Sequence, residues 1–138
     1  MTDRDKQDDA AALVHWTYSR EEWNAFMNWK KKRKGLIYYL VHKIFQKRNP
    51  KSPTIRITES QVSINNKHQP FHDASRRLQR INIRDAGQLN VVEISYQQSQ
   101  LPGTAAKEIH VPVPKGRLKE AIDMEEKLND IRIANPRD

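Results

Sequence analysis

The sequence predicts a single α+β domain, in which an N-terminal helical segment is followed by an antiparallel sheet, or partly open barrel, of five to seven strands and by a closing C-terminal helix. A chain of 138 residues has room for one modest core. Apolar residues recur at helical spacing up to residue 48 and again after residue 115, and they alternate with polar residues over 54–113. We therefore expect a disordered acidic tail over residues 1–12 and one domain over residues 13–134.

The helical segment is expected over residues 19–48, after a short strand in LVHWTY. Ser19 can cap a helix, and Glu22 three residues later completes a capping box. One face of the first turns carries three apolar side chains, Trp23, Phe26 and Met27. Because glycine weakens a helix interior, two alternatives stay open: one continuous helix, or two helices separated at Gly35.

Alternation of apolar and polar residues predicts the strands of the sheet. TIRITE and QVSIN form two of them, followed by a turn at Asn65, since asparagine tolerates the positive φ of a hairpin turn. RRLQRINIRD forms another strand, with an irregularity near Arg80 where the parity of the apolar residues shifts. QLNVVEISYQ and KEIHVPV complete the sheet, and Pro112 places the last strand at an edge.

The C-terminal helix is expected over residues 115–131, where it can close an open sheet. At the angular spacing of an α-helix, Leu118, Ala121, Ile122, Glu125 and Leu128 share one face, with Met124 and Ile131 beside it, which predicts an amphipathic helix whose apolar residues lie together.

Three stretches of the chain, HWTYSREEWNAF, TIRITESQVSIN and EIHVPVPKGRLKEA, resemble the bacterial pleckstrin-homology-like (PH-like) families, most closely the YcxB-like type. The resemblance extends over most of residues 13–130 and implies a PH-like sheet capped by a C-terminal helix, without implying a reaction. Such families often place membrane-spanning segments between the early helix and the first strand. Residues 35–45 are too short for this, at about 16 Å of helix against a hydrocarbon core of roughly 30 Å.

The composition excludes several kinds of chemistry. The chain has no cysteine, and its four glycines are too widely spread for a phosphate-binding loop. His68 and His72 are four residues apart, but they lie in a proline-containing turn or strand, where this spacing does not converge on a metal. His110 alternates with core positions and is expected to face outward. We therefore expect a protein that is not an enzyme and that has no cofactor and no metal site.

The net charge of +8 comes from one place. Residues 30–48, KKKRKGLIYYLVHKIFQKR, carry +8 by themselves, and we call them the basic–apolar segment. Its candidate residues for binding an anionic surface are Lys30, Lys31, Lys32, Arg33, Lys34, Lys43, Lys47 and Arg48. Its candidate apolar docking face consists of Ile37, Leu40, Val41, Ile44 and Phe45.

Three interpretations of the basic–apolar segment stay open. Its apolar face could bury against the sheet or a second copy of the chain, at roughly 1.5–3 kcal/mol per large side chain. It could instead lie in a lipid interface, where each lysine near anionic headgroups adds up to roughly 1 kcal/mol. Its cations could also bind nucleic-acid phosphates, but this leaves the apolar face without a role.

These interpretations favour a non-enzymatic PH-like interaction module that self-associates and contacts an anionic membrane surface or a protein partner. The alternative is a basic nucleic-acid-binding protein that uses residues 30–48. The acidic N-terminus MTDRDKQDDA has no apolar signal region, and no apolar run nears the roughly 20 residues needed to span a bilayer. The expected location is therefore the cytoplasm, with peripheral contact to a membrane.

A second cationic group lies in SRRLQRINIRD. Arg76, Arg80 and Arg84 share one face of a strand if its parity holds, and they would then form an anion-binding patch. The preferred alternative is that these arginines pair with Glu93 or Asp85 across neighbouring strands.

Overall fold

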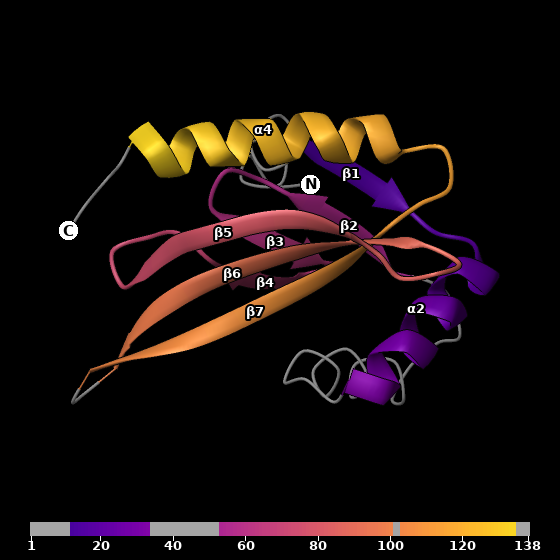
Figure 1. Cartoon of the computed structure of the whole chain (residues 1–138), viewed down its shortest axis with the longest axis horizontal. Helices are drawn as coiled ribbons and strands as arrows, with labels where there is room; N and C mark the ends of the chain where they lie inside the picture. Colours follow the sequence, from indigo (N-terminus) through magenta and orange to yellow (C-terminus); the bar gives the residue numbers. More distant parts are fainter. Residues whose placement is uncertain (1–11, 34–52, 101–102, 135–138) are drawn as a thin grey trace.

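The computed structural model describes residues 12–33, 53–100 and 103–134. In these residues seven strands form two antiparallel sheets, accompanied by an N-terminal and a C-terminal helix (Figure 1). The α+β class, the antiparallel pairing and the closing C-terminal helix are as predicted. The division into two sheets, neither of them closed, replaces the single sheet or partly open barrel that we expected.

Four short strands build the first sheet, which we call sheet A. Its order follows the chain, and β1 pairs with β2 although the helical segment separates them in sequence. The turn after β3 is the predicted one, because Asn65 has a φ of 53° and its side-chain oxygen accepts a hydrogen bond of 3.1 Å from the Thr54 amide. The strands are β1 (Val14–Thr17), β2 (Thr54–Ile57), β3 (Gln61–Ile64) and β4 (Lys67–Pro70).

Three longer strands build sheet B: β5 (Arg76–Asp85), β6 (Asn90–Gln100) and β7 (Gly103–Val113). The register between β5 and β6 shifts between Leu78 and Arg80, which confirms the predicted irregularity. β7 is an edge strand of sheet B, as Pro112 indicated. Side chains of β6 and β7 alternate between two faces: Val92, Ile94, Ile109 and Val111 lie on the core face, and Glu93 and His110 lie on the other, which we call the outer face of sheet B.

Helix α2 (Arg20–Arg33) begins with the predicted capping box. The Glu22 amide donates to Ser19 Oγ at 3.0 Å, and the Ser19 amide donates to Glu22 Oε1 at 2.8 Å. The other oxygen, Glu22 Oε2, accepts a hydrogen bond of 2.6 Å from the Lys115 amide, far along the chain. One carboxylate therefore connects the start of α2 to the loop that leads into the C-terminal helix. The choice between one helix and two at Gly35 lies outside the described residues.

Helix α4 (Leu118–Ala134) begins three residues later than predicted. Gly116 has a φ of 83°, and the Arg117 amide bonds to the Pro114 carbonyl, so a turn occupies residues 114–117 first. The helix packs across β5 and β1 through Ala121, Met124 and Leu128. The predicted apolar face was partly wrong, because Leu118 and Ile122 are 42% and 41% exposed.

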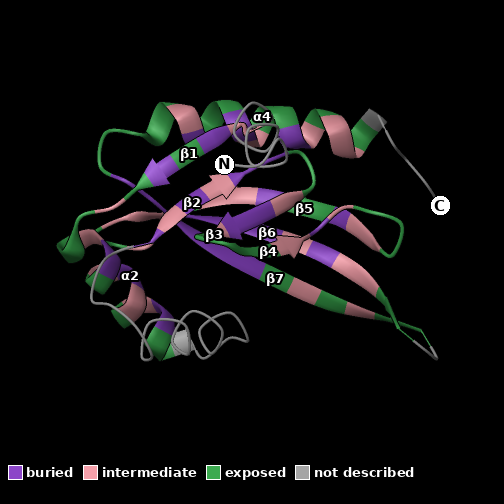
Figure 2. Ribbon diagram, turned by 180° about the vertical axis from the view of Figure 1, so that it is seen from behind, coloured by how far each residue is buried: buried purple, intermediate pink, exposed green. Residues whose placement is uncertain are grey.

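The core takes buried side chains from both sheets, from α4 and, through Trp23 and Phe26, from α2 (Figure 2). β6 runs through its centre, and a hydrogen bond of 2.8 Å from Gln69 Nε2 to the Tyr96 hydroxyl joins sheet A to sheet B. The largest fully buried apolar side chains are Trp16, Phe26, Ile55, Ile57, Phe71, Leu78, Ile94, Ile109, Met124 and Leu128.

Candidate functional site

Helix α2 is held against the outer face of sheet B by a row of aromatic side chains. Trp23 and Phe26 are buried, and their ring centroids are 5.2 Å apart. Phe26 stacks on Trp29 at 6.1 Å, and Trp29 meets the His110 ring edge-on at 5.3 Å. The row therefore ends on an imidazole of β7, at the point where the basic–apolar segment begins.

Lys30 is the first residue of that segment, and it does not face an anionic surface. Its side chain is only 2% exposed, and its ammonium group donates a hydrogen bond to His110 Nδ1. The prediction of a surface role is therefore wrong for this residue. The physical reason is that Lys30 lies one residue beyond Trp29 on the helix side that packs on sheet B, where burial of a charge requires polar partners.

Those partners form an ionic cluster of Lys30, Arg84, Glu93, Glu108 and His110. The buried Glu93 carboxylate accepts hydrogen bonds from Asn82 Nδ2 at 2.9 Å and from Arg84 Nε at 2.8 Å. His110 Nε2 lies 3.3 Å from Glu93 Oε2 and 2.5 Å from Glu108 Oε1. α2 and all three strands of sheet B thus contribute a charged or polar group to one network.

The network sets the protonation states of its members. Burial and the charge of Lys30 lower the pKa of His110, outweighing the neighbouring carboxylates, which raise it. Because an ammonium group only donates, Nδ1 of the neutral imidazole is an acceptor, and Nε2 carries the proton that faces Glu93 and Glu108. Burial opposes ionisation of Glu93, but its hydrogen bonds from Asn82 and Arg84 lower its pKa overall.

The same three side chains, Glu93, Glu108 and His110, could be considered as metal ligands, since their ligand atoms all lie within 4.8 Å of one another. A metal at this place would need the lone pair of His110 Nε2. The contact from Lys30 to Nδ1 instead leaves the proton on Nε2, and Arg84 holds Glu93. The bonding pattern is therefore that of an ion-pair network.

The other predicted residues of the segment are described only at its start. Lys31 and Lys32 are exposed on the last turn of α2, which ends at Arg33. The remaining candidates lie outside the described residues: Lys34, Ile37, Leu40, Val41, Lys43, Ile44, Phe45, Lys47 and Arg48.

The predicted arginine patch is divided by the irregularity in β5. Arg76 is opposite Gln98, whereas Arg80 and Arg84 are opposite Ser95 and Val91, so Arg76 lies on the other face of the sheet. Arg76 Nη1 also forms an ion pair of 3.0 Å with Asp73, and Arg84 pairs with Glu93 as the preferred alternative proposed. The single patch of Arg76, Arg80 and Arg84 is therefore wrong, because the strand does not keep its parity.

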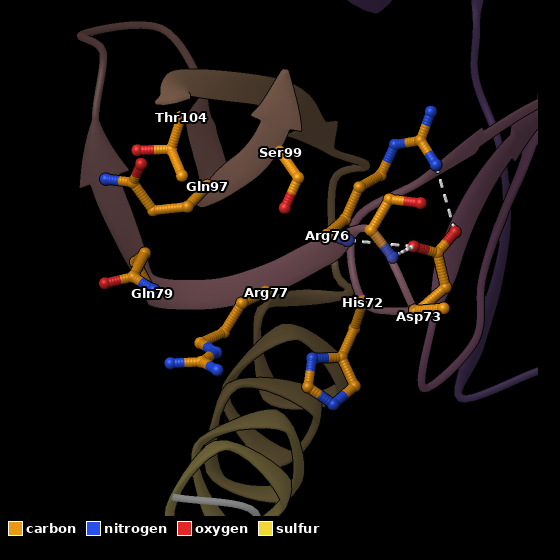
Figure 3. A pocket seen from close by; sticks show the side chains of 10 residues that line it. His72, Asp73, Arg76, Arg77, Gln79, Gln97, Ser99 and Thr104 are labelled. Carbon is orange, nitrogen blue, oxygen red and sulfur yellow. Dashed lines mark hydrogen bonds and ion pairs between the residues drawn. The ribbon is translucent and has the colours of Figure 1, made fainter. Parts of the chain in front are cut away.

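A polar groove of about 690 Å³ lies beside the loop before β5 (Figure 3). Asp73 accepts hydrogen bonds of 2.9 Å from the amides of Ser75 and Arg76, and its other oxygen binds the Arg76 guanidinium. Gln97, Ser99 and Thr104 supply further amide and hydroxyl groups. Arg76 is thus engaged with Asp73, and the groove combines neutral hydrogen-bonding groups with the charged Arg77.

The sequence contained one signal for the ionic cluster that periodicity did not reveal. Glu93 interrupts the apolar run NVVEIS of the most central strand, and a carboxylate in such a strand requires partners. Comparison of the chain with known protein families, curated proteins and solved structures finds no match. Among the described helices, none combines the length and the apolar character needed to cross a membrane.

Proposed function

We propose that the protein is a non-enzymatic PH-like interaction module of the cytoplasm that self-associates and rests on an anionic membrane surface. The observation that carries the proposal is the anchoring of α2. Buried Lys30 and the aromatic row hold the helix on sheet B, so that exposed Lys31 and Lys32 project from a fixed place on the domain. Five further cations follow Lys32 in the sequence of the basic–apolar segment.

The PH-like part of the proposal is supported by the order of the elements. Seven antiparallel strands are followed by a helix that packs across β5 and β1, and a sheet capped in this way is what the resemblance implies. In the described residues the buried Glu93 and His110 of sheet B contact each other, and Glu93 also binds Asn82 and Arg84, in the manner of a scaffold.

The membrane part of the proposal is supported by the composition of residues 31–48. With Lys30 buried, seven cations and no anion remain in this stretch, together with the apolar residues of the predicted docking face. Binding to an anionic membrane gives both groups a role, because the cations are attracted to the lipid headgroups and the apolar side chains are buried in the interface. Binding to nucleic-acid phosphates gives a role only to the cations and none to the apolar side chains.

Sedimentation with vesicles tests this function. The protein should sediment with vesicles rich in phosphatidylserine but not with pure phosphatidylcholine vesicles, and the bound fraction should fall as salt rises. Reversing the charge of Lys31 and Lys32 to glutamate should weaken binding by at least about tenfold, since each cation near the surface contributes roughly 1 kcal/mol. The matched control reverses Lys119 and Lys127 on α4, and it should bind as the wild type does.

Equal sedimentation with both vesicle types, or equal losses in the two double variants, would contradict the proposal. Replacement of Leu40 and Ile44 by glutamate separates the roles of the apolar face. Lost vesicle binding with an intact fold supports a lipid contact, whereas unfolding or separation of a dimer supports burial within the protein. Salt-sensitive binding to random-sequence DNA, without vesicle binding, would favour the nucleic-acid alternative.

A further inference from the structure

The outer edge of β7 is the longest free strand edge in the described part of the chain. β7 has 11 residues and pairs with β6 on one side (Figure 1). On its other side the Pro112 carbonyl accepts a hydrogen bond of 2.7 Å from the Tyr18 hydroxyl, whereas no described strand pairs there with residues 103–109. The other edges are protected in ways typical of natural sheets. α4 packs against β5, which also carries an irregularity. β1 and β4 have only four residues each, α4 also contacts β1, and β4 ends at Pro70.

The edge of β7 is well suited to pair with another strand. Its register with β6 is unbroken from Val113 to Gly103, so it has no bulge that would turn the edge away. Its only proline is Pro112, near the end of the strand. In an antiparallel strand, alternate residues direct their N–H and C=O groups away from the paired neighbour. The first four residues, Gly103, Thr104, Ala105 and Ala106, have small side chains that allow a second backbone to approach.

We propose that two copies of the chain associate through their β7 edges, as antiparallel strands related by a twofold axis at Ala106. The inference rests on the proposed self-association and names the surface that performs it. The two copies of sheet B then form one continuous six-stranded sheet. A strand is its own complement in such an arrangement, so the partner needs no feature that the chain lacks.

The charges on β7 select the register. A twofold axis perpendicular to the sheet pairs residues of equal parity, and an axis at Lys107 or Glu108 would place identical charges opposite each other. An axis at Ala106 places Ala106 opposite itself and Ala105 opposite Lys107 of the second copy. Thr104 then lies opposite Glu108, where its hydroxyl can donate to the carboxylate. This register pairs residues 103–109 of each copy, and it leaves Pro112 outside the paired region.

One strand pair buries less than the roughly 1,000 Å² expected of a stable interface, so the association should be weak and concentration-dependent. It should therefore be visible by sedimentation equilibrium at high protein concentration and should disappear on dilution. A weak dimer also fits an interaction module at a membrane, where confinement to the surface raises the local concentration of the chain.

Single-cysteine variants test the register directly, because the chain has no cysteine of its own. In the proposed dimer the two Cα atoms of residue 106 are about 4.5–5.5 Å apart, within the range of a disulfide. The two copies of residue 104 are four residues apart along the strand, about 13 Å, which a disulfide cannot span. Under mild oxidation, Ala106→Cys should therefore form a covalent dimer at least tenfold faster than Thr104→Cys. Both substitutions are at exposed positions of the same face.

The outcomes distinguish this inference from the proposed function. If the wild type dimerises but both variants cross-link at similar rates, the β7 surface is wrong and self-association stands. If the wild type stays monomeric at the highest concentration tested and Ala106→Cys does not cross-link, self-association itself is wrong. Vesicle binding is measured separately and depends on neither result. Circular dichroism of both variants checks that the substitutions leave the fold intact.

Discussion

Replacement of Glu93 by glutamine should destabilise the protein by about 2 kcal/mol at pH 7. Glutamine keeps the shape of the side chain and can still accept the hydrogen bond from Asn82, but it removes the charge that faces Arg84 and His110. A hydrogen bond to a charged group contributes roughly 1.5–3 kcal/mol. We take a value below the sum of two such bonds because Arg84 is 42% exposed and water can replace its partner.

Urea unfolding measures this loss as a lower midpoint with an unchanged slope. Thermal unfolding should show a decrease in Tm of about 6–8 °C for a domain of this size. The matched control is Glu126→Gln on the exposed side of α4, which should stay within about 0.5 kcal/mol of the wild type. Equal effects of the two substitutions would refute the stabilising role of the ionic cluster.

The effect of Glu93→Gln should also depend on pH. The pKa of Glu93 in the folded protein lies below its ordinary value of 4.5. The unfolded chain therefore binds a proton at a higher pH than the folded protein does, and the contribution of this carboxylate is present above about pH 4.5. The stabilisation by Glu93 is lost as the pH falls through the lowered pKa of this carboxyl group. The difference in the free energy of unfolding between the wild type and Glu93→Gln should therefore become smaller in that pH range. A difference that stays constant down to pH 3 would contradict this assignment.

Three further predictions concern single contacts. The free energy of unfolding of the wild type should decrease as the pH falls below about 6.5, because the unfolded chain protonates His110 whereas the lowered pKa of His110 opposes protonation in the folded protein. Denaturation curves at pH 7.5 and 5.5 should show a smaller pH dependence for His110→Gln than for the wild type. Ser19→Ala removes the cap of α2 and should cost about 1 kcal/mol in urea unfolding, whereas Ser60→Ala in an exposed turn should have little effect. Asn65→Ala replaces a residue that tolerates positive φ by one that does so less readily, and it deletes the hydrogen bond from the Thr54 amide, so its Tm should fall. Asn65→Gly loses the same hydrogen bond but adopts positive φ freely, so it should retain more of the stability than Asn65→Ala.

Local sequence signals predicted much of the fold. The capping box at Ser19, the turn at Asn65 and the irregularity near Arg80 each depend on residues that are close together in the chain, and all three are present. The division into two sheets could not be predicted in this way. It depends on pairing between β1 and β2, which are far apart in sequence, and a period of two does not specify which strands are neighbours.

The ionic cluster shows why the site was harder to predict than the fold. Alternation correctly placed His110 on the face opposite Ile109 and Val111, but it gave no sign that α2 covers this face. His110 faces outward from the core side of the sheet as predicted, but it is only 8% exposed because α2 packs over it. Lys30 was misplaced for the same reason, because a run of five cations contains no local mark of the one that is buried.

The two hydrogen bonds of the Glu22 carboxylate have a mechanical consequence. Glu22 Oε1 accepts a hydrogen bond from the Ser19 amide at the start of α2, and Glu22 Oε2 accepts one from the Lys115 amide just before α4, so a single carboxylate connects the two helices. A force on the C-terminal end of α2 is therefore resisted by the contact between Glu22 and Lys115 as well as by the contact between Lys30 and His110. A tilt of α2 would also displace α4, which packs across β5. A surface that binds the cations after Lys30 is thereby coupled, through α2 and Glu22, to α4 on the opposite side of the molecule.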